Sequence, residues 1–246
     1  MNSKTPELIS PNMTVAQIAV EKPEALHVFD KYRIDYCCGG DREFCEACTS
    51  AGLDPEKVFD EISQASSGTP SIATRVQSWT NSLLIDYIVQ NHHSYVRSSI
   101  PEIQTLLRKV VEVHGQENVE LNSIQQAFNE LADELVHHMH KEEFILFPAI
   151  KQLEEGVELK NPLGVTIQAP LSSIEHEHES AGRIIKAIRT LSCNYTPPEY
   201  ACPTFKITYK MLEEFDRDLM THIHLENNVL FERVKERGRP VHTIIL

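Results

Sequence analysis

The chain has 246 residues, of which 41% are apolar, so it can form one large domain or one ordinary domain with a small companion. Its formal net charge of −13 argues against a phosphate-binding surface, and we expect no nucleic-acid partner. The N-terminal residues lack a basic start followed by an apolar run, and no apolar stretch approaches the roughly 18 residues that span a bilayer, so we expect a cytoplasmic protein with no membrane partner.

Three short helices are expected before residue 66. Thr14 is a favourable N-cap for the first helix. The second and third, at residues 23–32 and 54–62, each have a proline near their start, where its missing N–H is tolerated. Residues 1–66 are therefore predicted to form a small helical domain, which is small for a core of its own and is expected to dock on another part of the protein.

Cys37 and Cys38 follow the second helix and are followed by Gly39-Gly40, which indicates a tight, exposed turn. Adjacent cysteines cannot easily form a disulfide without strain. Adjacent side chains also diverge, so they would chelate one metal ion poorly. Redox chemistry, or one thiolate reaching another site of the protein, is the favoured interpretation, and the alternative is that both are small buried residues.

The other four cysteines are Cys45, Cys48, Cys193 and Cys202. The spacing of Cys45 and Cys48 suits a redox or metal half-site, but no second pair completes a zinc ribbon, and a structural role is equally open. Cys193 and Cys202 fall at predicted helix ends and are interpreted as structural. Without an export signal, we expect reduced thiols.

Residues 67–74 have the composition of a linker, and almost everything after them indicates long helices. The expected helices are 75–113, 120–153, 171–191 and 200–236. The connection over 154–170 is long enough to cross the end of a bundle. We therefore predict an all-α protein, with residues 75–240 forming a four-helix bundle.

An internal repeat supports the bundle. The sequence from His138 to Glu142 has a counterpart from His222 to Glu226, 84 residues later. Upstream of the two copies, His93 and His178 are 85 residues apart, which is nearly the same separation. Each half is thus a helical hairpin, and two stacked hairpins form an up-down four-helix bundle.

The apolar stripe of each long helix passes through histidine or glutamate at one level. In the second helix, the three-and-four spacing continues from Leu135 through His138 and Glu142 to Ile145. The other three helices behave alike. The residues placed on the buried faces are His93, His138, Glu142, His178, His222 and Glu226.

His92 and His93 are adjacent, so either could belong to this set, and the stripe through Val96 and Ile100 favours His93. The histidines off the stripes are expected to be solvated or to neighbour the ligands. They are His92, His137, His140, His176 and His224.

These six residues predict a metal site. Two buried carboxylates cost several kcal/mol each unless a cation compensates them. Imidazole and carboxylate without thiolate suit iron better than structural zinc, with manganese or zinc as weaker contenders. Two bridged ions would leave positions for oxo or hydroxo bridges and for O₂ or nitric oxide. A ferritin-like site is less favoured, because such sites usually have Glu-x-x-His rather than His-x₃-Glu.

The sequence resembles the RIC family (repair of iron centres), in which a cysteine module precedes a hemerythrin-like domain. The resemblance covers nearly the whole chain. It rests on Asp35-Tyr36-Cys37-Cys38-Gly39-Gly40, on the segments around His138 and His178, and on His222-x-x-Leu225-Glu226-Asn227-Asn228. The family's ligand pattern implies the same six residues, and its spacing to Arg97 and Pro101 also favours His93.

The resemblance implies a protein that repairs iron–sulfur clusters damaged by nitrosative or oxidative stress, by supplying iron from a labile, oxo- or hydroxo- and carboxylate-bridged site of two non-haem irons. It also implies a homodimer, client iron–sulfur proteins, and Cys37 and Cys38 as redox or cluster-related thiols. The alternatives are nitric oxide reduction at the same site, which leaves open whether the protein is an enzyme, and a module that senses O₂ or redox state.

Overall fold

The computed structural model describes residues 9–65, 76–156 and 167–237, and within these ranges it contains helices and connecting segments but no β-strand. The all-α prediction is confirmed. The chain divides into two compact units, one of Met1–Trp79 with His224–Glu232 and one of Thr80–Ile223 with Arg233–Leu246. The predicted linker at 67–74 lies outside the described residues, so the exact limits of the two domains stay a prediction.

The N-terminal segment contains four short helices. They are α1 (Val15–Glu21), α2 (Ala25–Tyr32), α3 (Phe44–Ser50) and α4 (Pro55–Gln64). Three of them match the predicted helices. Thr14 caps α1, because its side chain accepts a hydrogen bond from the Gln17 amide while the Thr14 amide donates one to the Gln17 side chain. Asp54 is the N-cap residue of α4, and its side chain accepts a hydrogen bond from the Glu56 amide.

Helix α3 was not predicted, because its start is fixed by distant pairing and not by a local cap. The Phe44 amide donates to the Met13 carbonyl, and Thr14 and Glu43 form an isolated antiparallel bridge. The aromatic ring of Phe29 lies 6.1 Å from Tyr36 and 6.4 Å from Phe44, all three fully buried. This segment therefore buries an aromatic core, although the sequence alone suggested that it is small for one.

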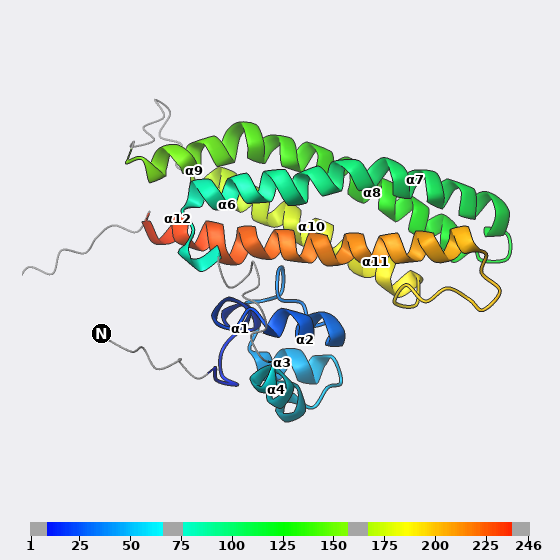
Figure 1. Ribbon diagram of the computed structural model, residues 1–246, viewed down its shortest axis with the longest axis horizontal. Coiled ribbons are helices and arrows are strands. Elements are labelled where there is room, and N and C mark those ends of the chain that lie inside the picture. Colours follow the sequence, from blue (N-terminus) through cyan, green and yellow to red (C-terminus); the bar gives the residue numbers. More distant parts are fainter. Residues whose placement is uncertain (1–8, 66–75, 157–166, 238–246) are drawn as a thin grey trace, which may run out of the picture. The chain divides into compact units, whose positions relative to one another are not determined.

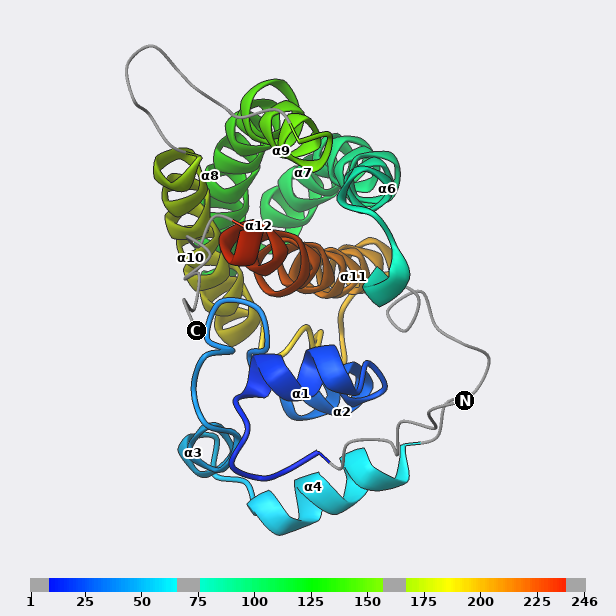
Figure 2. The same ribbon diagram turned by 90° about the vertical axis from the view of Figure 1, so that its left-hand side faces the viewer.

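The other helices form four long runs. The first is α6 (Asn81–Tyr87), η2 (Ile88–His93) and α7 (Ser94–His114); the second is α8 (Glu120–Lys141), η3 (Glu142–Leu146) and α9 (Phe147–Glu154); the third is α10 (Gln168–Leu191); the fourth is α11 (Pro203–His224), η4 (Leu225–Phe231) and α12 (Glu232–Arg237). Helices α7, α8, α10 and α11 lie side by side in Figure 1, and Figure 2 shows the bundle from its end. This arrangement confirms the predicted four-helix bundle.

The first run begins later than predicted. Val76–Ser78 form only a short 3₁₀ turn, and the helix starts at Asn81 because the Thr80 hydroxyl accepts a hydrogen bond from the Leu83 amide. Glu154, at the end of the second run, accepts from the amides of Asn81 and Ser82 at 2.8 and 2.9 Å. This carboxylate satisfies the helix N-terminus and fixes the relative register of two runs.

The predicted register of the second helix is wrong after Glu142. Residues 142–146 form η3, a π-helical turn, which takes one more residue per turn than an α-helix. The stripe therefore slips by one position. Ile145, predicted in the core, is 58% exposed, whereas Leu146 and Ile150 are buried in its place.

A buried polar cluster holds the turn after α10. Cys193, Asn194 and Tyr195 all have positive φ values, between 49° and 57°, which is unfavourable for residues with a side chain. The Tyr195 hydroxyl donates to Asp216 at 2.8 Å, and Arg189 binds the same carboxylate with two nitrogens at 2.6 and 2.8 Å. These contacts between α10, the turn and α11 compensate the strained backbone.

Candidate metal centre

Three of the four helical runs change to π-helix where the candidate ligands lie. His93 ends η2, Glu142 begins η3, and Glu226 lies within η4. His178 is the exception, in the middle of the regular helix α10. Single π turns inside α-helices are often found at functional sites, because the extra residue re-aims neighbouring side chains.

The structure brings all six predicted site residues together, and none is more than 3% exposed. Their ligand atoms form two groups, and within each group all atoms lie within 4.8 Å of one another. One group is His93, Glu142, His222 and Glu226, and the other is His138, Glu142, His178 and Glu226. Both glutamates belong to both groups, so the arrangement offers two neighbouring metal positions that share two carboxylates.

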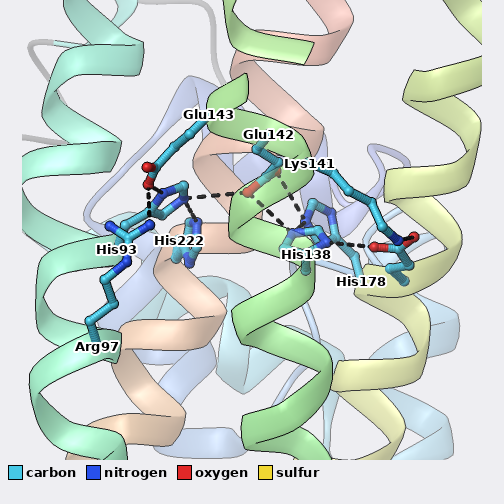
Figure 3. A network of polar contacts seen from close by, with 9 residues as sticks. His93, Arg97, His138, Lys141, Glu142, Glu143, His178 and His222 are labelled. Atoms are coloured by element: carbon cyan, nitrogen blue, oxygen red, sulfur yellow. Dashed lines mark hydrogen bonds and ion pairs between the residues drawn. The ribbon is translucent and has the colours of Figure 1, made fainter. Parts of the chain in front are cut away.

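The imidazoles face one another in pairs (Figure 3). The Nε2 atoms of His93 and His222 lie 3.1 Å apart, and those of His138 and His178 lie 2.9 Å apart. Two imidazole nitrogens that bind adjacent positions of a six-coordinate ion, each about 2.1 Å from it, are about 3.0 Å apart, while a tetrahedral ion separates them by about 3.4 Å. Both pairs therefore fit six-coordinate ions better than tetrahedral zinc.

Glu142 lies between the two pairs. Its Oε2 atom is 3.4 Å from Nε2 of His93 and 3.3 Å from Nε2 of His138. These separations are longer than an ordinary N–H···O hydrogen bond of about 2.7–3.2 Å, and they place the carboxylate oxygen between one imidazole nitrogen of each pair. A fully buried carboxylate needs a compensating charge, and cations between its oxygens and the imidazoles would supply it.

A carboxylate outside each pair orients one imidazole. Nδ1 of His93 lies 2.6 Å from Glu143 Oε1, and the Arg97 guanidinium donates to the same oxygen at 2.7 Å. Burial raises the pKa of Glu143, but the hydrogen bonds from His93 and Arg97 outweigh it, so the pKa is lowered overall. Glu143 therefore stays ionised and accepts a hydrogen bond from Nδ1–H of His93, which leaves the Nε2 lone pair of His93 directed into the centre.

The second pair has the same arrangement. Nδ1 of His138 lies 3.0 Å from Glu177 Oε2, and Lys141 Nζ donates to Glu177 Oε1 at 2.6 Å. The hydrogen bond from His138, assisted by that from Lys141, lowers the pKa of Glu177 to about 2. Sequence reasoning missed both carboxylates, although each is adjacent in the chain to a candidate ligand. Their contacts join different helices, and helix periodicity does not show such contacts.

The structure also separates His93 from His92. Only His93 belongs to a candidate ligand group, whereas the His92 ring stacks on His222 with an interplanar angle of 8°. Of the remaining off-stripe histidines, His137, His140 and His176 are exposed. His224 is buried, with its ring edge-on to Tyr36 at 5.5 Å, because the segment that contains it belongs to the same compact unit as Tyr36.

A cavity of about 480 Å³ borders one side of the centre. It lies between α8 and α10, and its lining includes His138, His178, Lys141 and Glu177. A small molecule or ion in this cavity would be next to one imidazole pair and to the carboxylate that orients it.

The cysteine turn differs from the expectation in two respects. Cys37 is buried and Cys38 is half-buried, so the turn is not exposed, and burial raises the pKa of the Cys37 thiol. The two sulfur atoms converge to 3.3 Å and do not diverge. Asp35 causes this geometry, because its Oδ1 atom accepts hydrogen bonds from both cysteine amides, at 3.1 and 3.0 Å. A side chain at Gly40 would meet the Tyr36 carbonyl at 2.6 Å, so the turn requires glycine there.

Asp35 is a further residue that sequence reasoning missed as a functional group. Its carboxylate and the two sulfur atoms lie within 4.8 Å of one another. All six cysteines have free thiols. Cys48 is fully buried in the N-terminal segment, and Cys45 donates to the Pro11 carbonyl at 3.4 Å. The redox role of Cys37 and Cys38 stays a prediction.

Comparison with known proteins gives two domain matches. Residues 11–66 match a domain described as of unknown function (DUF542), and residues 84–234 match the hemerythrin HHE cation binding domain. The chain is 32% identical to "Iron-sulfur cluster repair protein YtfE" of Yersinia pseudotuberculosis serotype IB (strain PB1/+) over 222 residues. The aligned region covers 90% of this chain and 96% of that protein. The protein of the same name from Yersinia pestis (strain Pestoides F) has the same identity and coverage.

None of the helices in the described part of the chain is both long and apolar enough to cross a membrane.

Proposed function

The chain belongs to the family of iron–sulfur cluster repair proteins that carry a hemerythrin HHE domain, and from this premise we propose that it repairs damaged iron–sulfur clusters by supplying iron from a di-iron centre. The hemerythrin-like domain implies non-haem iron binding. In the proposal, His93 and His222 hold one iron, His138 and His178 hold the other, and Glu142 and Glu226 bridge them.

The observation that carries the proposal is the sharing of two carboxylates by two ligand groups. Nitrogen and oxygen donors without thiolate suit iron in preference to structural zinc. When bound, the two irons supply exchangeable ferrous or ferric ions, or redox chemistry with small molecules. The protein's own residues bury the site, direct the Nε2 atoms of His93 and His138 inward through Glu143 and Glu177, and leave one side next to a cavity.

Iron donation is favoured over nitric oxide reduction and over O₂ or redox sensing, because the relatives are named for cluster repair. The proposal also includes a homodimer and client iron–sulfur proteins as partners. For the client, the iron of this centre is a substrate and not a permanent cofactor, so the site must release it. The side chains of Glu143 and Glu177, which orient two of the ligands, are 19% and 27% exposed, and this partial access to solvent is consistent with a centre that can exchange its metal.

Iron transfer tests the proposal directly. The protein is loaded with ⁵⁷Fe and mixed with an apo-ferredoxin, sulfide and a thiol reductant, and cluster formation is followed by ⁵⁷Fe Mössbauer spectroscopy. We expect the label in the new clusters with wild-type protein and not with the His138→Ala/Glu142→Ala double variant. A matched control is His137→Ala/Glu179→Ala, which changes exposed neighbours of the same residue types.

Equal transfer by the double variant and by wild type would exclude iron donation from this centre. Catalytic formation of nitrous oxide with an electron donor, in the absence of iron transfer, would favour nitric oxide reduction instead.

A further inference from the structure

His92 is buried beside the candidate metal centre, yet it belongs to neither ligand group. Its ring stacks on the ring of His222, with centroids 5.5 Å apart and planes inclined by only 8°. Its Nδ1 atom lies 2.9 Å from Asp218 Oδ1. Because Asp218 precedes His222 by four residues on α11, one imidazole from η2 contacts two successive turns of that helix.

The orientation of the His92 ring is fixed from a further direction. The ring of Tyr87 meets it edge-on, at 5.6 Å and 75°. The Nε2 atom of His92 is buried and has no hydrogen-bond partner among the described residues. Burying a polar nitrogen in this way is unfavourable, and a phenyl ring would fill the space without that cost. The contacts that distinguish histidine here are therefore the hydrogen bond to Asp218 and the face that it presents to His222.

We propose that His92 is a positioning residue of the metal centre, which holds the ring of His222 by stacking and is itself held by Asp218. This inference rests on the proposed function, because it takes His222 as an iron ligand. The Asp218 carboxylate accepts a hydrogen bond from Nδ1–H of His92 and increases the electron density of the ring, as carboxylates do for the imidazoles that they orient. An imidazole bound to a metal cation is electron-poor, and stacking against an electron-rich ring stabilises it.

The centre then uses two different ways to orient its imidazoles. Carboxylates bind Nδ1 of His93 and of His138 at the edge of each ring. His222 is instead contacted on its face, by a second imidazole. Both kinds of contact act on the metal through a ligand, and loss of such an orienting partner typically weakens metal binding by about 10- to 100-fold. The effect of His92 is expected on the iron that His222 holds, and not on the iron held by His138 and His178.

The test uses the full-length protein loaded with ⁵⁷Fe and compares wild type with His92→Leu, His92→Phe and Asp218→Asn. Three quantities are measured: iron per chain, the rate of iron release from the reduced protein to a ferrous chelator, and the Mössbauer spectrum. His137→Leu is the matched control, because His137 is an exposed histidine on α8. Circular dichroism verifies that each variant is folded.

We expect two irons per chain in every variant. His92→Leu should release one of the two irons about tenfold faster and change the quadrupole splitting of one iron component only. His92→Phe should release iron more slowly than His92→Leu, because it keeps a flat ring that can stack on His222. Both His92→Phe and Asp218→Asn should show the altered Mössbauer component. The His137→Leu control should match wild type in all three measurements.

Two results would overturn the inference while leaving the di-iron proposal intact. One is wild-type release and an unchanged spectrum in His92→Leu. The other needs His93→Phe as an additional variant: loss of an iron in His92→Phe together with retention of both irons in His93→Phe would make His92 a ligand itself. Fewer than two irons in the wild-type protein would instead reject the proposed di-iron centre, and the inference with it.

Discussion

The Nε2 atoms of His93 and His222 lie 3.1 Å apart, although 129 residues separate the two histidines in the chain. Glu143 occupies the Nδ1 side of His93, so the Nε2 atom of His93 carries a lone pair that faces the second imidazole. The pair His138 and His178 repeats this relationship at 2.9 Å. Facing imidazoles at these separations, around shared carboxylates, fit the pair of six-coordinate ions that we propose.

Substitution of a shared carboxylate should reduce metal binding. We expect Glu142→Gln to hold at most one iron per chain, because Glu142 belongs to both ligand groups and an amide oxygen is a weaker, uncharged ligand. The metal-free variant should unfold at the same or a higher urea concentration than metal-free wild type, because it no longer buries a carboxylate. Metal analysis and urea titration measure the two effects. Glu179→Gln, at an exposed position, is the control.

The carboxylates that orient the imidazoles should affect affinity without changing the ligand set. We expect Glu143→Gln and Glu177→Gln each to keep two irons at saturation but to weaken iron binding by about 10- to 100-fold, because the Nδ1 proton of His93 or His138 loses a charged acceptor. Competition with a chelator of known affinity measures the change. Unchanged affinity in both variants would show that these contacts do not support the centre.

The buried cluster at the end of α10 should stabilise the fold independently of the metal. Tyr195→Phe removes one hydrogen bond to the buried Asp216 carboxylate, and hydrogen bonds to charged groups contribute about 1.5–3 kcal/mol. The free energy of unfolding from urea titration should fall by about that amount, with two irons per chain retained. Loss of iron in this variant would link the turn to the metal centre, contrary to our account.

Cys48 should make the stability of the N-terminal segment decrease in alkali. Burial raises its pKa to about 11 from an ordinary value of 9.0. The unfolded chain therefore loses this proton first, so the stabilising contribution is complete below about pH 9 and is lost as the pH rises toward 11. Urea unfolding at pH 8, 9 and 10 should show a steeper fall for wild type than for Cys48→Ala. Comparison with the alanine variant removes the contribution of other thiols and tyrosines. If the free energy of unfolding falls equally with pH in the two proteins, Cys48 is not the cause.

Helix periodicity was sufficient to predict that these six residues lie together, because each apolar stripe passes through the buried level where they lie. It was not sufficient for the local geometry. The π turn at 142–146 moved Ile145 to the surface, since the choice between α and π hydrogen bonding depends on packing between helices. Glu143 and Glu177 were missed because they act across helices, on His93 and His138.

The cysteine turn shows the same limit. Sequence reasoning expected Cys37 and Cys38 to be exposed and to diverge, on the basis of the two glycines alone. Their burial and convergence depend on Asp35, which binds both cysteine amides. Helix α3 was missed for a related reason, because backbone pairing with the segment before α1 determines where it begins.

Metal analysis combined with Mössbauer and EPR spectroscopy of the protein from iron-replete cells tests the central claim most directly. We expect two irons per chain. The oxidised form should have no EPR signal, because two ferric ions joined by an oxo or hydroxo bridge couple antiferromagnetically to a diamagnetic ground state, and one-electron reduction should give a mixed-valence signal. A protein that contains only zinc, or one metal ion per chain, would contradict the di-iron centre.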